Sequence, residues 1–131
     1  MKSTLPSPEV GLLLFAHGAR DPRWAQPFEQ VVAAVRAARP AQPVRLAYLE
    51  FLAPDIRSAA AALVAEGCTR VHVLPLFLGA GGHVRKDLPP LLDELHAVHP
   101  GVTFALYPAV GEAPALIAAM ADIALALPET P

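Results

Sequence analysis

The chain has 131 residues, of which 54% are hydrophobic and 17% charged, and its formal net charge is −2. This length and apolar content suit one domain with a sizeable core. The slightly acidic balance argues against a nucleic-acid-binding protein, which normally carries a basic stripe. A lone cysteine, Cys68, excludes an internal disulfide bond and fits a reducing cytosol.

Neither an export signal nor a membrane span is expected from the sequence. Pro6, Pro8 and Glu9 interrupt the N-terminal segment before any long apolar run. The longest apolar run, residues 10–16, is far shorter than the roughly 20 residues that cross a bilayer. We therefore expect a cytoplasmic protein that binds neither membrane nor nucleic acid.

Apolar runs and amphipathic segments alternate along the chain. The runs predict buried strands, and apolar residues spaced three and four apart predict helices between them. In chain order the predicted elements are a strand at 10–16, a helix at 24–38, a strand at 44–49, a helix at 56–65, a strand at 71–76, a helix at 88–98, a strand at 102–106 and a helix at 113–127. This alternation favours a parallel sheet with helices on both faces. The predicted fold is α/β, a three-layer single domain (1–131, core about 10–127) with a four-stranded parallel sheet flanked by helices.

Three metal-binding residue types follow three of the predicted strands. His17, Glu50 and His83 come after the first, second and third strand, 33 residues apart each time (17 to 50 and 50 to 83). Taken singly, each is more often an ordinary loop or capping residue. Because ligands of open α/β sheets bind beyond the carboxyl ends of the strands, the three together predict a metal site at one edge. Two imidazoles and a carboxylate suit Co²⁺, Ni²⁺, Fe²⁺ or Zn²⁺ better than Mg²⁺ or Ca²⁺.

The segment Gly79-Ala80-Gly81-Gly82 allows two interpretations. Its backbone N–H groups precede a helix and would bind an anion, or its glycines serve a turn that needs positive φ. It lacks the Gly-Lys-Ser/Thr ending of a phosphate-binding loop and the spacing of a dinucleotide fingerprint, so no nucleotide is expected.

Basic residues flank both histidines. Arg20, Arg23, Arg85 and Lys86 would attract an acidic substrate, and they would equally be ordinary solvated charges. For Arg20, an ion pair with Asp21 within the loop is an equal alternative.

The remaining reactive residue types do not form a second site in the sequence. His72, His96 and His99 are predicted to be structural. No serine stands at a strand-to-helix elbow, and Cys68 precedes its strand and so lies at the opposite edge, which disfavours a nucleophilic hydrolase.

Three segments of the chain resemble the CbiX/SirB class II chelatases in their short form. They are residues 13–22 (LLFAHGARDP), residues 48–50 (YLE), and residues 73–78 (VLPLFL) together with 82–89 (GHVRKDLP), and the likeness covers roughly residues 10–125. The resemblance implies a chelatase-like, flavodoxin-like fold and a homodimer with the active cleft between subunits. One departure is Ala16-His17-Gly18-Ala19, where the family motif usually reads Gly-His-Gly-Ser.

The activity implied by the resemblance is a lyase reaction, the insertion of a divalent metal into sirohydrochlorin in cobalamin or sirohaem biosynthesis without a nucleotide. The metal would be Co²⁺, or else Fe²⁺ or Ni²⁺. His17 and His83 would hold it, one of them taking a pyrrole proton, and Glu50 would bind the cation or accept the second proton. Contacts to the tetrapyrrole are expected from the residues around the two histidines: Arg20, Arg23, Gly81, Gly82, Arg85 and Lys86. Two alternatives stay open, a non-catalytic metal carrier on the same fold and a phosphate-ligand enzyme that uses the glycine segment.

Overall fold

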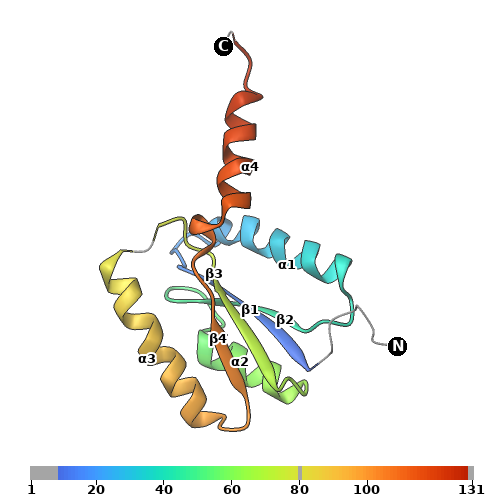
Figure 1. Cartoon of the computed structure of the whole chain (residues 1–131), viewed down its shortest axis with the longest axis vertical. Helices are drawn as coiled ribbons and strands as arrows, with labels where there is room; N and C mark the ends of the chain where they lie inside the picture. Colours follow the sequence, from blue (N-terminus) through green and yellow to red (C-terminus); the bar gives the residue numbers. More distant parts are fainter. Residues whose placement is uncertain (1–8, 80, 130–131) are drawn as a thin grey trace.

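Four parallel strands form the centre of the molecule. A computed structural model describes residues 9–79 and 81–129 (Figure 1). The strands are β1 (Val10–Ala16), β2 (Val44–Tyr48), β3 (Arg70–Pro75) and β4 (Thr103–Leu106). They pair in the order β2-β1-β3-β4, with every pair parallel. The predicted four-stranded parallel sheet is confirmed.

Helices cover both faces of this sheet, as the alternating pattern predicted. On one face lies α1 (Gln26–Ala38), and on the other lie α2 (Ile56–Ala65) and α3 (Gly82–Val98). The fourth helix, α4 (Pro114–Leu125), contacts chiefly the 3-10 turn η2 (Val110–Glu112) and projects from the sheet, and a second 3-10 turn, η1 (Pro22–Ala25), precedes α1. Within the described residues, no helix is both long and apolar enough to cross a membrane.

The main core lies between the sheet and the pair α2 and α3. Leu13 and Phe15 of β1 and Val71 and Val73 of β3 are completely buried there, as is Leu63 of α2. Their alternate spacing in each strand directs them to one face, which is the period-two rule of strands. A smaller apolar cluster under α1 is built around residues 14, 32 and 44 on the other face. The burial on both faces fixes the sheet and therefore the edge at which its strands end.

Two predicted helix boundaries were wrong at their N-terminal ends. The helix predicted at 88–98 begins six residues earlier, at Gly82, and contains Pro89 and Pro90. Prolines favour the first turn of a helix, and the apolar periodicity of the sequence starts at Leu88, so the pattern placed the start too late. Similarly, Trp24 lies in η1 before α1, where its ring packs on Phe28 with centroids 4.6 Å apart.

The start of α2 is fixed by a side-chain cap. The Asp55 carboxylate accepts a hydrogen bond of 2.8 Å from the backbone N–H of Ser58, and this bond holds the pKa of Asp55 below its ordinary value. Replacing Asp55 by alanine should lower the free energy of unfolding by about 1 kcal/mol at neutral pH, whereas asparagine, which also caps, should cost less. Because the folded-state pKa is lowered, the contribution of the charged cap is present above the unfolded pKa and is lost as pH falls through the folded one. Urea unfolding of the three proteins at neutral and acidic pH measures both effects, and an equal loss for alanine and asparagine would contradict the cap.

Candidate functional site

The loops after β1 and β2 bring His17 and Glu50 together. The pairing of the two strands continues past their ends, with Leu49 N–H donating to the Ala16 carbonyl at 2.9 Å and Glu50 N–H to the His17 carbonyl at 3.1 Å. His17 Nε2 then lies 3.9 Å from Glu50 Oε1, and the two side chains are 48% and 51% exposed. A nitrogen and an oxygen donor therefore lie side by side at the carboxyl edge of the sheet, open to solvent, as the strand-end positions predicted.

Gly18 allows this close approach of the two loops. Its φ is +97°, in the region that favours glycine, and an added Cβ would lie 1.8 Å from the Glu50 carbonyl oxygen. A side chain at this position would therefore push apart the two segments that carry the histidine and the glutamate.

An aromatic ring lies against one side of the pair His17 and Glu50. The His17 ring meets the ring of buried Phe77, which follows β3, in an edge contact with centroids 5.5 Å apart. This contact limits the rotation of the imidazole and leaves its Nε2 beside Glu50. His17 is thus held from one side and accessible from the other, which suits a ligand that must take up and release a metal.

The third predicted ligand, His83, lies in the first turn of α3. The side chains of residues 82–85, which include Gly82, His83 and Arg85 from the predicted site, lie outside the part that the structure describes. Among the described residues, no group of three His, Cys, Asp or Glu side chains is close enough to hold a metal. The pair His17 and Glu50 is therefore observed, and a third ligand from His83 stays a prediction.

The glycines before α3 do not serve a turn with positive φ. Gly81 caps α3 with φ −67°, Gly79 is not in the positive-φ region, and an added Cβ at either position would meet no atom within 4 Å. The turn interpretation of these two glycines is wrong. Neither the backbone angle nor packing against the described residues requires glycine at these two positions.

Of the basic residues near the pair, Arg23 forms an ion pair, whereas no ion pair is seen for Arg20 or Lys86 among the described contacts. Arg23 donates to both carboxylate oxygens of Asp21, at 2.8 Å for the shortest bond, and this contact lowers the pKa of Asp21. The ion pair considered for Arg20 with Asp21 is therefore wrong, since Arg23 occupies that carboxylate. Arg20 instead lies over the ring of Phe51, 5.1 Å from its centroid, and Lys86 is exposed.

Three exposed apolar residues at this edge were missed by sequence reasoning. Leu49, Phe51 and Leu78 follow β2 and β3 and are 37%, 57% and 69% exposed. We call these three the apolar rim. Phe51 has φ 67°, which is unusual for a bulky residue and typical of functional sites. The sequence pattern does not separate the three from Phe77, which also follows β3 but is buried in the core.

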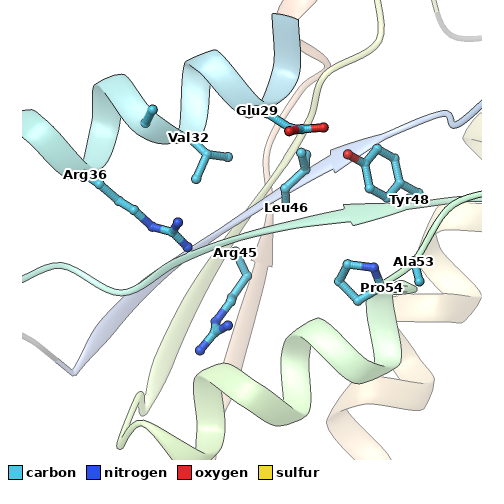
Figure 2. A pocket seen from close by; sticks show the side chains of 9 residues that line it. Glu29, Val32, Arg36, Arg45, Leu46, Tyr48, Ala53 and Pro54 are labelled. Carbon is cyan, nitrogen blue, oxygen red and sulfur yellow. The ribbon is translucent and has the colours of Figure 1, made fainter. Parts of the chain in front are cut away.

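Of two hollows in the described part of the chain, one lies near this region and the other does not. One of about 560 Å³ adjoins the apolar rim through Leu49 and lies between α2 and α3, whose Arg57 and Glu94 form an ion pair of 2.7 Å across it. Another of about 480 Å³ runs along the outer edge of β2 beneath α1 (Figure 2). Arg36, Arg45 and Tyr48 line the second hollow, and burial, followed by the charge of Glu29, raises the pKa of Tyr48. None of the predicted site residues lines the second hollow, so it lies apart from the candidate site.

The sequence of this chain is similar to those of characterised proteins. A sirohydrochlorin cobaltochelatase of Methanococcoides burtonii is 27% identical over 86 residues, which are 66% of this chain and 66% of that protein. The alignment thus spans just under two thirds of the relative's length.

The similarity to solved structures covers more of the chain. A structure named as a cobalamin (vitamin B12) biosynthesis CbiX protein, from Marinobacter aquaeolei VT8, superposes with a TM-score of 0.79 at 33% identity, covering 88% of this chain and 94% of that one. The sirohydrochlorin chelatase SirB from Bacillus subtilis subspecies spizizenii, solved in complex with cobalt, shares the fold with a TM-score of 0.75 at 24% identity, covering 88% of this chain and 51% of that one.

The family comparison extends over nearly the whole fold. The model of the family described as CbiX matches residues 11–125, from β1 through the end of α4. That range contains His17, Glu50 and His83 together with the complete sheet. The chain belongs to the CbiX family.

Proposed function

We propose that this protein is a sirohydrochlorin chelatase that inserts a divalent metal, Co²⁺ first among the candidates, into a tetrapyrrole. The observation that carries the proposal is the pair His17 and Glu50, 3.9 Å apart and half exposed at the carboxyl edge of a CbiX-family sheet. The name of the Methanococcoides relative and the cobalt in the SirB structure support cobalt as the metal. Fe²⁺ and Ni²⁺ suit the same nitrogen and oxygen donors, so the choice in the cell depends on availability as well as geometry.

Metal insertion requires the exchange of two protons for one cation. As the metal enters the ring, two pyrrole nitrogens each lose a proton, and the metal forms bonds to the ring nitrogens while leaving its protein ligands. His17 Nε2, which is accessible to solvent, and His83 would hold the metal at one face of the macrocycle, and one of these imidazoles would take the first proton. Glu50 Oε1, adjacent to His17, would balance the charge of the cation and accept the second proton.

The apolar rim supports a tetrapyrrole as the second substrate. Leu49, Phe51 and Leu78 offer exposed apolar surface beside a metal-binding pair, which a flat macrocycle can cover. Arg20, above Phe51, and Lys86 are the described cations that could meet the peripheral carboxylates of the macrocycle. Arg85 and the backbone at Gly81 and Gly82 complete the proposed substrate contacts, and Arg23 joins them only if it leaves Asp21.

The experiment that tests this function follows the visible absorption of sirohydrochlorin with Co²⁺, with and without the purified protein. A chelatase accelerates the spectral change catalytically, at protein concentrations well below that of the substrate. A metal carrier binds Co²⁺ in a titration but leaves the insertion rate unchanged, and this result would refute the chelatase. An insertion rate that needs neither metal-binding histidine would point instead to a phosphate-ligand enzyme built on the glycine segment.

The proposal includes a homodimer and a cytoplasmic location. SirB is about twice as long as the part that this chain matches, since the chain covers 51% of it. A second copy of this chain would therefore supply the other half of an active cleft between two domains. The sole cysteine, Cys68, is buried, which fits a reducing compartment.

Arg20→Ala distinguishes substrate binding from metal binding. The guanidinium lies over Phe51 and is not one of the proposed metal ligands, so its loss should raise the KM for sirohydrochlorin about tenfold, the effect of one lost charge-assisted contact. The Kd for Co²⁺ in a calorimetric titration should stay unchanged. Arg39→Ala, at the far end of α1, is the matched control and should alter neither constant. A changed Co²⁺ affinity in Arg20→Ala with an unchanged KM would contradict this assignment.

A further inference from the structure

The edge of the sheet formed by β2 holds a hollow that the proposed reaction does not use (Figure 2). β2 is the outermost strand on its side, since the strand order is β2-β1-β3-β4, and the hollow lies along it beneath α1. Its volume of about 480 Å³ falls in the range of ligand pockets, roughly 300 to 1,000 Å³. Its lining combines polar and apolar side chains, among them Glu29, Val32, Arg36, Arg45, Leu46 and Tyr48. We call this hollow the edge pocket.

The backbone of Leu46 faces the edge pocket with an unused donor and an unused acceptor. At the start of the ladder between β1 and β2, Leu12 N–H donates to the Pro43 carbonyl at 2.9 Å. At its end, Leu49 N–H donates to the Ala16 carbonyl, also at 2.9 Å. The odd-numbered residues of β2 therefore bond to β1, and the N–H and carbonyl of Leu46 point away from it, with no partner among the described residues. A residue of this kind on an edge strand pairs with an added extended peptide.

The open stretch of this edge is short, because groups at both of its ends are already bonded. At the start of β2, the Val44 carbonyl accepts a hydrogen bond of 3.0 Å from Arg36 Nη2. At the end of the strand, Tyr48 N–H donates to the Pro54 carbonyl at 2.9 Å. The five residues of β2 span about 13 Å, so a peptide of about three residues fits between these two ends. A longer strand from another protein would meet Arg36 or Pro54, and the edge therefore suits a short ligand.

The two ends of the edge pocket carry opposite charges. Glu29 and Arg36 are seven residues apart on α1, which is two helical turns or about 10 Å, and both are exposed. Figure 2 places Glu29 at the end where Tyr48 lies, whereas Arg36 reaches the start of the strand. The guanidinium of Arg36 has five N–H donors, and its bond to the Val44 carbonyl uses one of them. The pocket therefore offers a carboxylate at one end and a cation at the other.

A buried hydroxyl without a partner faces the edge pocket. Tyr48 lines the pocket and is 6% exposed, yet its hydroxyl has no hydrogen bond among the described residues. Figure 2 shows this hydroxyl directed toward the Glu29 carboxylate, which also has neither a hydrogen bond nor an ion pair within the described part of the chain. A buried phenol normally bonds through its hydroxyl. A cationic N–H donor placed between these two side chains would bond to both oxygens.

We propose that the edge pocket binds a short peptide with free termini, extended and antiparallel to β2. The ammonium group of the peptide lies between the Glu29 carboxylate and the Tyr48 hydroxyl. The middle residue exchanges both backbone hydrogen bonds with Leu46. The terminal carboxylate meets the free N–H groups of Arg36. This site is separate from the chelatase site, because none of the described residues that line the pocket is a proposed metal ligand or substrate contact.

The neighbouring side chains determine which sequence such a peptide needs. Residues directly opposite each other in an antiparallel pair point to the same face of the sheet. The middle residue therefore shares the face of Leu46, which packs in the apolar cluster of Val32, and should be apolar. The third residue shares the face of Arg45, whose side chain is 40% exposed and bonds to Glu66 through Nη2 at 3.1 Å, and should be acidic. The peptide Ala-Val-Glu meets these needs.

The first test titrates the isotope-labelled full chain with Ala-Val-Glu and follows the backbone amide signals by NMR. The Leu46 amide signal should shift and saturate, because its N–H gains an acceptor. Two matched peptides are Ala-(N-methyl-Val)-Glu, which lacks the N–H that donates to the Leu46 carbonyl, and Ala-Val-Lys, which reverses the charge that faces Arg45. Each should bind about tenfold more weakly, the effect of one lost hydrogen bond or charged contact. A Leu46 amide that does not respond, or equal affinities for the three peptides, would overturn the peptide site.

The second test changes the pocket at the end that holds the ammonium group. Tyr48→Phe removes the hydroxyl and keeps the ring, and Glu29→Gln removes an exposed charge, so both variants should fold. Each should raise the Kd for Ala-Val-Glu about tenfold. Arg39→Ala is the matched control, since Arg39 lies just past the end of α1, outside the pocket, and should leave the Kd unchanged. An unchanged Kd in both Tyr48→Phe and Glu29→Gln would contradict the proposed site.

The third test distinguishes a short free peptide from a strand of a partner protein. Gly-Gly-Ala-Val-Glu and Ala-Val-Glu-Gly-Gly extend the ligand at either end and are titrated in the same way. Both should bind more weakly than Ala-Val-Glu, because each moves one terminal charge away from its partner and carries the chain into Pro54 or Arg36. Tighter binding of either extended peptide would show that the edge receives a longer strand, and would refute the short ligand.

Discussion

Replacing His17 by alanine is expected to lower the rate of metal insertion into sirohydrochlorin by at least about 100-fold, the usual contribution of one proton-transferring side chain. The substitution removes the imidazole whose Nε2 lies beside Glu50, so the affinity for Co²⁺ should fall as well. The fold should persist, because His17 is half exposed and the bonds between the two loops run through backbone atoms. The measurement is the visible spectral change with Co²⁺ at saturating sirohydrochlorin, together with calorimetric binding of Co²⁺ alone.

His96→Ala is the matched control for this experiment. His96 lies in the last turn of α3, at the opposite edge of the sheet, where its ring meets Phe104 with centroids 5.6 Å apart. Its loss should leave both the insertion rate and the Co²⁺ affinity near wild type. Insertion at the wild-type rate by His17→Ala would refute the proposed mechanism, whereas a loss in both variants would indicate a general effect of removing an imidazole.

The site residues that were predictable from the sequence are those that directly follow the ends of strands. The positions of His17 and Glu50 followed from two apolar runs and the rule that parallel strands end at one edge, and the structure places their atoms 3.9 Å apart. Arg23 was not separable from Arg20 in the sequence, because which arginine reaches Asp21 depends on the turn at η1. The apolar rim was missed because periodicity assigns every large apolar residue to a core, while Phe51 lies on a turn with positive φ.

The fold was predictable where buried residues recur at regular spacing along a strand or helix. The bounds of α2 were predicted as observed, since Asp55 caps its start and Gly67 follows its end. The start of α3 was not, since the apolar periodicity that placed it begins only at Leu88. The sequence pattern also predicted α4 as a helix, but its alanine-rich composition could not show that it would leave the sheet uncovered.

Replacing Gly18 by alanine is expected to disrupt the site through the backbone, without removing either of the proposed ligands His17 and Glu50. The new Cβ would lie 1.8 Å from the Glu50 carbonyl oxygen, and that oxygen belongs to the segment held against His17. Either the loop after β1 or the loop after β2 must shift, which separates Nε2 of His17 from the Glu50 carboxylate. Co²⁺ affinity should therefore fall even though both side chains remain.

Gly67→Ala makes this prediction specific, because the two glycines share a φ of +97° and differ in what surrounds them. An added Cβ at Gly67 would meet no atom within 4 Å, so this variant reports the cost of the left-handed backbone alone, about 1 kcal/mol of unfolding free energy. Gly18→Ala adds a steric overlap with backbone and should cost about 3 kcal/mol. Urea unfolding compares the stabilities, and a Co²⁺ titration compares the sites. Equal losses of stability with equal Co²⁺ affinities would mean that the loops relax freely, and that the approach of Glu50 to His17 does not depend on glycine.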